Sequence, residues 1–323
     1  MDTTSFPLQL LEHMHGTVAV VGSMNVDYTI TTARLPEPGE TVAGGPLELL
    51  PGGKSGNQAA AAALLGAEHA HVGSDSNADF LLDHLAAAGV DTSHVRHVDG
   101  PSGLTVITVD ASAENTIVYS AGSNAQVSVD YVESKIGELT GADVLGLCLE
   151  SPIETVTACA RMCHEAGVRV LLNDSPFTAD LPAELIAHTD ILLVNEIEMA
   201  QLLDLQAPAD DDWSAFDWPL ALERLEALGI RQAVVTLGAD GSVVLDATAD
   251  EHVTRIAPVR VDAVDTTGCG DSFMGTVLAG LASGWSLAAS ARAAAYVSAY
   301  AASGRGAQAS YGTPAQIRAK FEA

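Results

Sequence analysis

The sequence predicts an α/β fold of three layers, in which a mostly parallel central sheet carries helices on both faces, with a small β-sheet beside it. From Ala142 onward, short apolar runs alternate with helical segments, which is typical of parallel strands buried on both faces. Two extended segments, residues 28–50 and 105–120, interrupt this alternation and predict the small sheet, which would form a lid. Residues 17–323 are expected to form this domain, and residues 1–16 a flexible extension.

Each element follows from its local pattern, in chain order. Apolar, β-branched runs predict the central strands, and Ala-rich or periodic segments predict the helices. Pro36 and Pro38 predict a turn within the first lid segment, and a polar tip at residues 110–115 predicts a hairpin in the second. The expected strands are Val18–Val21, His69–Gly73, Val144–Leu149, Val168–Leu172, Ile191–Val194, Ala233–Thr236 and Ser242–Leu245. The expected helices are Gln58–Leu65, Asn77–Ala88, Ile153–Glu165, Glu196–Leu203, Pro219–Leu228, Ser272–Leu281 and an Ala-rich pair within Val277–Ala302.

The charge balance excludes some classes of partner. The 323 residues include 42 acidic and 14 basic side chains, a formal charge of -28, which disfavours nucleic acid and anionic membranes as partners. Charged and small polar residues interrupt the most apolar stretch, residues 277–302, so no membrane span is expected. The four cysteines lack disulfide or zinc spacing and no secretory signal is recognised, which indicates reduced thiols in a cytoplasmic protein.

Polar residues collect where the predicted strands end. Ligands of parallel α/β sheets bind beyond the carboxyl ends of the strands, so this distribution predicts a binding site there. Any one Asn or Asp among them is better explained as a helix cap or turn residue, but five strand ends carry the pattern. The residues are Asn25, Asp27, Glu150, Asn173, Asp174, Asn195, Glu196, Glu198, Thr236, Gly238 and Gly241.

Two glycine-rich loops open onto helices. In the first, residues 52–57, Gly53 and Lys54 precede an Ala-rich helix; in the second, residues 265–271, Gly268 and Gly270 precede Asp271. Glycines permit close backbone approach, and N–H groups at a helix N-terminus favour anions. The second loop therefore predicts an anion hole with a carboxylate beside it, which could act as a base on a hydroxyl attacking a phosphoryl group. The plain alternative for Asp271 is a helix cap.

These segments resemble a known family. Residues 263–273 (AVDTTGCGDSF) and 51–59 (PGGKSGNQA) are similar to the two signatures of the ribokinase-like (PfkB) carbohydrate kinases, and nearest to its ribokinase branch. GSMNVD, PEPGET, LESP, NEIE, TLGADG and GAQAS follow the family's order. The segment LNDSPF at residues 172–177 differs from the family pattern LNPAP, Ser55 and Gly56 invert the usual order, and Cys269 replaces the usual alanine.

The resemblance implies roles at the matching positions. Asp271 would be the catalytic base, with the amides of Gly268, Cys269 and Gly270 stabilising the transferred phosphoryl group. Glu198 would be linked to Mg2+. The sugar would contact Asn25, Asp27, Gly53, Lys54, Asn57, Glu150 and Asp271. ATP would contact Asn195, Thr236, Gly238, Gly241 and Gly270. An activating K+ would lie near Asp265, Thr267, Ala301, Gly304, Gly306 and Ser310, as backbone and carboxylate oxygens suit a hard cation.

The implied activity is transfer of the γ-phosphoryl group of ATP to a primary hydroxyl, with D-ribose as the expected acceptor and D-ribose 5-phosphate as the product. Mg2+ and K+ are the expected cations, and a homodimer through the β lid is the expected assembly. A nucleoside kinase, or a kinase of another pentose or a ketohexose, would use the same residues. A non-catalytic sugar-binding regulatory protein is the alternative from another class, which the joint presence of Asp271, Gly268, Gly270 and Asn195 disfavours.

Overall fold

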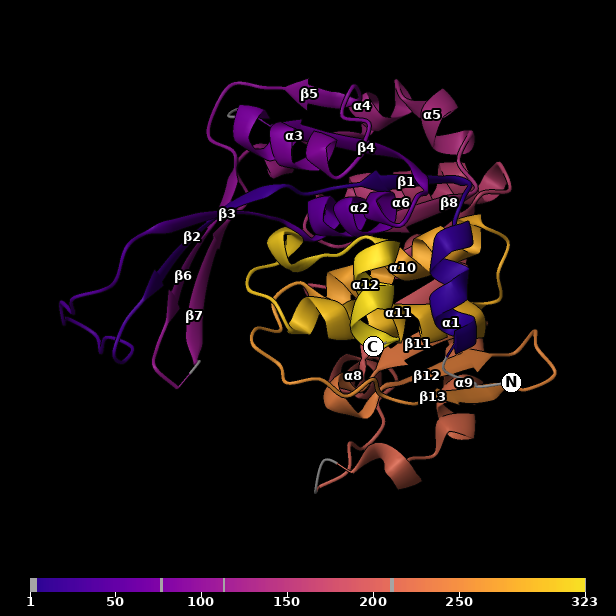
Figure 1. Ribbon diagram of the computed structural model, residues 1–323. Helices are drawn as coiled ribbons and strands as arrows, with labels where there is room; N and C mark the ends of the chain where they lie inside the picture. The colour runs from indigo at the N-terminus through magenta and orange to yellow at the C-terminus, as the bar shows by residue number, and fades with distance from the viewer. Residues whose placement is uncertain (1–4, 76–77, 113, 210–211, 323) are drawn as a thin grey trace.

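A central sheet organises the chain. The computed structural model describes residues 5–75, 78–112, 114–209 and 212–322, and within them the sheet has nine strands in the order β13-β12-β11-β10-β9-β8-β1-β4-β5 (Figure 1). The strands from β11 to β5 in this order are parallel, whereas β12 and β13 pair antiparallel at one edge. Their bounds are β1 Thr17–Val21, β4 Glu68–Asp75, β5 Val95–His97, β8 Val144–Leu147, β9 Arg169–Asn173, β10 Ile191–Asn195, β11 Gln232–Thr236, β12 Ser242–Asp246 and β13 Val253–Ile256.

Helices cover both faces of this sheet, as the sequence predicts. Alternate side chains of one strand point to opposite faces, so Ala19 and Val21 of β1 enter one core while Val18 and Val20 enter the other. The first core takes its helical residues from α4 (Val129–Glu133), α5 (Ile136–Thr140), α6 (Ile153–Glu165), α7 (Ala183–Ala187), α8 (Glu196–Leu202) and α9 (Trp218–Leu228). The second takes them from α1 (Ser5–Leu10), α2 (Lys54–Leu64), α3 (Ala78–Ala87), α10 (Cys269–Ala282), α11 (Leu287–Ala302) and α12 (Pro314–Phe321).

A separate four-stranded sheet confirms the predicted small sheet. It consists of β2 (Asn25–Thr31), β3 (Glu48–Gly52), β6 (Gly103–Val109) and β7 (Asn115–Ser120), in the order β3-β2-β6-β7. Figure 1 shows it extending away from the three layers. Because β2 begins soon after β1 ends, the small sheet joins the body at the carboxyl end of a central strand. That junction is where a site in an α/β fold is expected.

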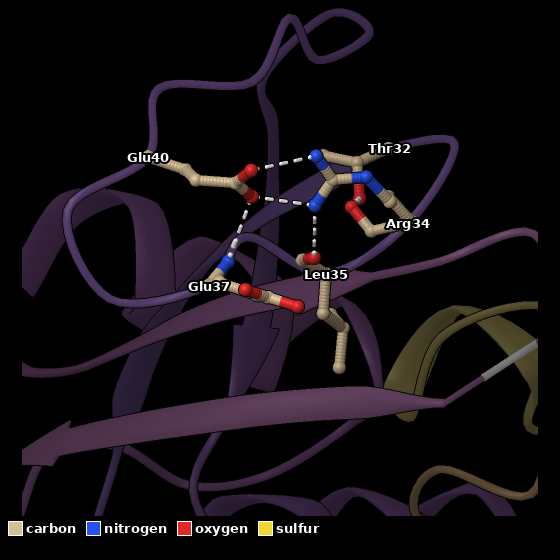
Figure 2. Close-up of polar contacts among 5 residues, drawn as sticks. All are labelled: Thr32, Arg34, Leu35, Glu37 and Glu40. Atoms are coloured by element: carbon tan, nitrogen blue, oxygen red, sulfur yellow. Dashed lines mark hydrogen bonds and ion pairs between the residues drawn. The ribbon is translucent and has the colours of Figure 1, made fainter.

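The predicted turn between β2 and β3 is part of a long loop, residues 32–47. An ion pair folds it on itself (Figure 2): Nη1 and Nη2 of Arg34 donate to Glu40 at 2.5 and 3.0 Å. Glu40 also accepts the backbone N–H of Glu37 at 3.0 Å, and Arg34 Nη1 donates to the Leu35 carbonyl. These contacts give the exposed loop a defined shape above the small sheet.

The N-terminal segment departs from expectation. Residues 1–4 lie outside the described part, but residues 5–13 form α1 and a short 3-10 helix, in which Leu8 and Leu11 are completely buried. Burial of a leucine side chain stabilises by about 1.5–3 kcal/mol, and α1 packs against α11 and α12. An ion pair from Arg318 to Glu12 adds a further contact. The prediction of a flexible extension is therefore wrong for residues 5–13.

A few other boundaries also differ. The sequence did not indicate β13 or α12, and α3 begins at Ala78, since the predicted first residue Asn77 lies outside the described residues. Within the described ranges, no helix combines the length and the apolar character needed to cross a bilayer.

Candidate active site

The N-terminal turns of α2 and α10 meet at the carboxyl edge of the parallel strands. Gly275 of α10 permits this close packing, since an added Cβ would lie 2.5 Å from the Gln58 carbonyl oxygen and 2.7 Å from the Ala61 Cβ. The side chains of Asn57 and Asp271, one on each helix, are therefore brought into contact. The sequence placed both in one site, and the structure brings them together.

Asp271 is held by two amide side chains. Asn57 Nδ2 donates to its Oδ2 at 2.9 Å and Gln58 Nε2 to its Oδ1 at 3.1 Å. The side chain is buried, and burial raises its pKa, although the charge of Lys54 opposes the rise. The result is a carboxylate that is fixed in place and more basic than an ordinary aspartate, as a general base requires.

The loop before α10 has the predicted glycine geometry. Gly268 has φ of 76°, and an added Cβ would lie 2.6 Å from the Ala307 Cβ and 2.7 Å from the Tyr311 hydroxyl. The same hydroxyl donates to the Gly268 carbonyl at 2.9 Å. In contrast, an added Cβ at Gly270 would meet no atom within 4 Å. The first turn of α10 thus faces open space, where the helix N-terminus attracts negative charge.

Cys269 differs from its expected role. The sequence predicted that its backbone N–H would be free to bind an anion. In this structure the N–H instead donates a hydrogen bond to the Thr266 carbonyl at 3.2 Å. Its thiol donates to the Ser298 carbonyl at 3.6 Å, and burial raises the pKa of the thiol to about 11. The side chain therefore acts in packing and is weakly reactive at neutral pH.

A second carboxylate, Asp27, lies at the junction with the small sheet. Thr105 Oγ1 donates to its Oδ1 at 2.5 Å, and an added Cβ on Gly52 would lie 2.0 Å from its Oδ2. Burial raises the pKa of Asp27 to about 6; the Thr105 hydrogen bond opposes the rise, and the charges of Glu150 and Asp271 add to it. Three carboxylates thus share one electrostatic environment.

Glu150 and Lys54 complete this group. Ser23 Oγ donates to Glu150 Oε2 at 2.5 Å, and the backbone N–H of Lys54 donates to the same oxygen at 3.0 Å. Burial by itself lowers the pKa of Lys54. The negative charges of Asp271 and Glu150 have the larger combined effect, and the pKa of Lys54 is raised. The ammonium group therefore stays protonated among the carboxylates. Gly53, with φ of 87°, places the turn against Asn25.

Several polar residues of the site were not predicted. Asn124 Nδ2 donates to Asn25 Oδ1 at 2.8 Å, and Gln308 Nε2 donates to Asn57 Oδ1 at 3.0 Å. Each fixes the amide orientation of a predicted residue. Asn57 and Gln58 are adjacent polar residues before an alanine run, which was a signal for Gln58. Gln308 lies in the GAQAS segment, although no role was assigned to it, whereas nothing local marked Asn124. Their contacts span 251 and 99 positions of the chain.

A cavity of about 320 Å³ lies on the other side of the α10 N-terminus. Its wall includes the predicted nucleotide residues Thr236, Gly238 and Gly241 together with Cys269 and Gly270. The sequence missed the rest of its wall, which is mainly apolar: Ala239, Pro258, Val259, Arg260, Val261, Ala263, Thr266, Phe273, Ala295, Ser298, Ala299 and Ala302. Gly270 therefore stands between this cavity and Asp271.

Asn195 and Glu198 form a reciprocal cap at the start of α8. Asn195 Oδ1 accepts the Glu198 N–H, and Glu198 Oε2 accepts the Asn195 N–H, both at 2.8 Å. Asn195 lies opposite Thr236 in the sheet register, although it is not in the wall of the cavity. Burial raises the pKa of Glu198, while the Asn195 hydrogen bond and the charge of Lys54 oppose the rise. The cap interpretation of this motif is therefore confirmed, while its role at the nucleotide stays a prediction.

The residues expected around K+ come from two neighbouring loops. The N–H groups of Thr267 and Gly306 donate to Asp265 at 2.9 and 2.8 Å, and an added Cβ on Gly304 would lie 2.7 Å from the Ser310 Cβ. Burial by itself raises the pKa of Asp265. The hydrogen bonds from these N–H groups have the larger effect, and the pKa is lowered. An ionised carboxylate is the kind of oxygen ligand that a hard cation prefers, and the assignment of K+ to these loops stays a prediction.

A buried carboxylate, an open helix N-terminus and a cavity beside them are an arrangement that suits transfer of a phosphoryl group to an alcohol. Residues 16–314 match the pfkB family of carbohydrate kinases. The chain belongs to this family, and it is a phosphotransferase that acts on an alcohol group.

Named relatives point to sugar kinases. The chain is 34% identical over 266 residues to a ribokinase of Haemophilus influenzae, covering 81% of this chain and 84% of the relative. It is 30% identical over 298 residues to a deoxyribokinase of Salmonella typhimurium, covering 91% and 95%. The structure of Arabidopsis thaliana ribokinase complexed with ribose and ATP superposes with a TM-score of 0.84 at 26% identity, covering 96% of this chain and all of that one. The chain is therefore a sugar kinase of the ribokinase type.

Proposed function

We propose that this chain phosphorylates D-ribose at its primary hydroxyl, using ATP and yielding D-ribose 5-phosphate and ADP. The observation that carries the proposal is the position of Asp271, which is close enough to Asp27, Glu150 and Lys54 for their charges to interact and which directly follows Gly270 in the wall of the cavity. The sugar would lie beside the charged group and the nucleotide in the cavity. The relatives named above support ribose as the acceptor.

The chemistry follows from this arrangement. Asp271 accepts the proton of the sugar hydroxyl, whose oxygen forms a bond to the γ-phosphorus while the bond from that phosphorus to the bridging oxygen of ADP breaks. Asp27 and Glu150 accept hydrogen bonds from the sugar hydroxyls, which charge strengthens. The N-terminus of α10 stabilises the negative charge of the transferred group. Asn57 and Gln58 hold the carboxylate in the required orientation.

Two cations belong to the proposal. When bound, Mg2+ neutralises the nucleotide phosphates and K+ strengthens the positive potential of the anion hole. Glu198 is the protein group assigned to Mg2+, and the loops of Asp265 and Gly306 are assigned to K+. The protein has a net charge of -28, so a broad basic surface does not attract the nucleotide, and binding depends on local sources of positive charge.

The small sheet is assigned both as the lid over the sugar and as a dimer interface. Its exposed apolar side chains include Leu49, Val106, Ile117 and Val118, and Val118 is 67% exposed. An apolar surface of this kind is typical of an interaction site. Light scattering after size exclusion should give twice the monomer mass, and Val118→Asp should give the monomer mass; a wild-type monomer would refute the dimer.

An assay of ADP formation tests the activity. D-ribose, 2-deoxy-D-ribose, D-fructose, adenosine and inosine should be compared, with and without K+. Ribose should give the highest kcat/KM, and K+ should raise it. A highest value for deoxyribose would favour the second candidate, which the deoxyribokinase relative supports. ADP formation with none of the five would favour the non-catalytic alternative.

Asp271→Asn tests the base. Loss of a general base should lower kcat at least ~10²-fold, while ribose binding by calorimetry changes little. Asp130→Asn, on the exposed side of α4, is the matched control and should retain full activity. Near-normal turnover of Asp271→Asn would exclude the assigned role.

A further inference from the structure

A turn near the C-terminus reaches the proposed base through a chain of two amide side chains. The turn is η5 (Gln308–Ser310), which lies between α11 and α12 and packs against α2 and β3. Gln308 Nε2 donates to Asn57 Oδ1 at 3.0 Å, and Asn57 Nδ2 donates to Asp271 Oδ2 at 2.9 Å. Gln308 is therefore linked to Asp271 through one intervening side chain, and it has no part in the chemistry described above.

The carboxylate fixes the direction of these hydrogen bonds. An ionised carboxylate only accepts hydrogen bonds, whereas an asparagine side chain has an accepting oxygen and a donating nitrogen. Asn57 therefore has to turn its Nδ2 towards Asp271, which leaves its Oδ1 on the opposite side of the amide. Because Asn57 is only 6% exposed, that oxygen needs a donor from the protein. Gln308 supplies this donor.

Packing alone does not explain a glutamine at position 308. Its Oε1 is buried and has no hydrogen-bond partner within the described residues, and an unpaired buried acceptor is unfavourable. A methionine would fill a similar volume without this unpaired oxygen. The useful part of the Gln308 side chain is therefore the donating nitrogen, which contacts Asn57.

The backbone on both sides of Gln308 is held in place. The Gly306 N–H donates to Asp265 Oδ2 at 2.8 Å. The Tyr311 hydroxyl donates to the Gly268 carbonyl at 2.9 Å. Both accepting residues belong to the loop before α10. The turn is therefore fastened to the same loop that carries the proposed anion hole, which restricts where the Gln308 amide can lie.

The hydrogen bond from Asn57 changes the acidity of the base. Burial raises the pKa of Asp271, while the charge of Lys54 and the Asn57 hydrogen bond oppose the rise. Glu150 adds to the rise, and a second hydrogen bond from Gln58 opposes it. Other titratable groups that interact electrostatically with Asp271 are Asp27, Cys269 and Tyr311. All these groups remain when an uncharged residue replaces Gln308, so a further rise in the pKa of the base would report loss of the Asn57 bond.

We propose that Gln308 is a positioning residue, which holds the Asn57 amide in the one orientation in which this amide donates to Asp271. The proposal rests on the proposed function in one respect, the role of Asp271 as the base. It gives a function to the glutamine of the GAQAS segment. It also makes the reactivity of the base depend on a residue that acts on it only through Asn57.

Two variants of similar size test this role. Gln308→Met removes the donor, and Gln308→Glu replaces it with an acceptor, which favours rotation of the Asn57 amide away from the orientation that Asp271 requires. The kcat for ribose should fall ~10-fold in Gln308→Met and at least as much in Gln308→Glu, because a hydrogen bond to a charged group is lost. The KM for ATP should change little. Gln9→Glu, on the exposed side of α1, should match wild type.

The pH profile separates positioning from a general loss of structure. Because the base must be ionised to accept a proton, a raised pKa moves the acid limb of the kcat/KM profile to higher pH. Gln308→Met adds no titrating group and should move this limb upwards by roughly 0.5–1 pH unit. Partial unfolding would lower the active fraction and the Tm without moving the limb. An acid limb at the wild-type position in both Gln308 variants would overturn the proposal.

A double-mutant cycle tests the route through Asn57. In an Asn57→Ala background, Gln308→Met should lower kcat no further, because the side chain that Gln308 positions is absent. A further loss as large as the one in the wild-type background would refute action through Asn57.

A measurement without turnover keeps the two proposals separate. Carbon-13 NMR of the aspartate carboxyl groups, with the Asp271 signal assigned from Asp271→Asn, gives the pKa of the base directly. Turnover of ribose by wild type, with an unchanged Asp271 pKa in Gln308→Met, would refute the positioning role alone. A raised Asp271 pKa in Gln308→Met, together with no turnover of any sugar by wild type, would refute the proposed function alone.

Discussion

Replacement of Asp27 by asparagine should stabilise the protein while it damages the sugar site. The wild-type carboxylate is ionised at pH 8 although burial raises its pKa from 3.8 to about 6. At ~1.4 kcal/mol for each tenfold change in proton affinity, this difference costs the folded state about 3 kcal/mol. Asparagine removes the charge and keeps an oxygen that can accept the Thr105 hydroxyl.

The pH dependence has a defined sign. A carboxyl group whose pKa is raised in the folded state destabilises that state when it is ionised. The penalty is absent below about pH 4, grows between about pH 4 and pH 6, and is complete above about pH 6. The gain in unfolding free energy from Asp27→Asn should therefore be ~3 kcal/mol at pH 8 and ~1.5 kcal/mol at pH 5. For 323 residues, the gain at pH 8 corresponds to a rise in Tm of about 4 °C.

Thermal unfolding of the ligand-free protein at pH 8 and pH 5 measures both values. Asp180→Asn, an exposed aspartate, should leave Tm unchanged at either pH. The ribose KM of Asp27→Asn should rise at least ~10-fold, because charge-assisted hydrogen bonds of about 1.5–3 kcal/mol are weakened. An unchanged or lower Tm at pH 8 would refute the reasoning that burial penalises this carboxylate.

Further tests address the loop before α10 and its cysteine. Gly268→Ala should lower Tm, because the φ of 76° is unfavourable for alanine and the nearby Ala307 leaves no room for a Cβ. Gly270→Ala should leave Tm unchanged or slightly raised. It should lower kcat/KM for ATP, because the added methyl group enters the open cavity. Equal Tm values for the two variants would contradict this difference. Iodoacetamide should inactivate the enzyme slowly at pH 7.5, because burial raises the pKa of Cys269 to about 11, and ATP should protect it. Active Cys269→Ala should resist the reagent; inactivation that ATP does not slow would place the reactive thiol elsewhere.

The sequence identified the residues at the strand ends because their signal is local. A polar residue at or shortly after the end of an apolar β-branched run is expected near the carboxyl edge of a parallel sheet, whichever strands lie beside it. Asn25, Glu150 and Asn195 were found in this way. The glycine loops were equally local signals, since Gly53 and Gly268 both have the positive φ values that such turns require.

Contacts between distant segments could not be read in the same way. Asn124 and Gln308 join the site through side chains that meet it only after folding, and the wall of the cavity from Pro258 to Val261 carries no pattern of its own. The N-terminal helix was not predicted, because Leu8 and Leu11 stabilise it only when the folded chain, including α11, buries their side chains.

The sequence by itself determined the α/β class, the two glycine loops and the position of the candidate base, since strand periodicity and glycine conformation are properties of short segments. Only the tertiary structure decided how strongly burial raises the pKa values of Asp271 and Asp27, and that the Cys269 N–H is already bonded. The physical reason is that desolvation and like-charge repulsion depend on which surfaces enclose a group, and those surfaces come from all parts of the chain.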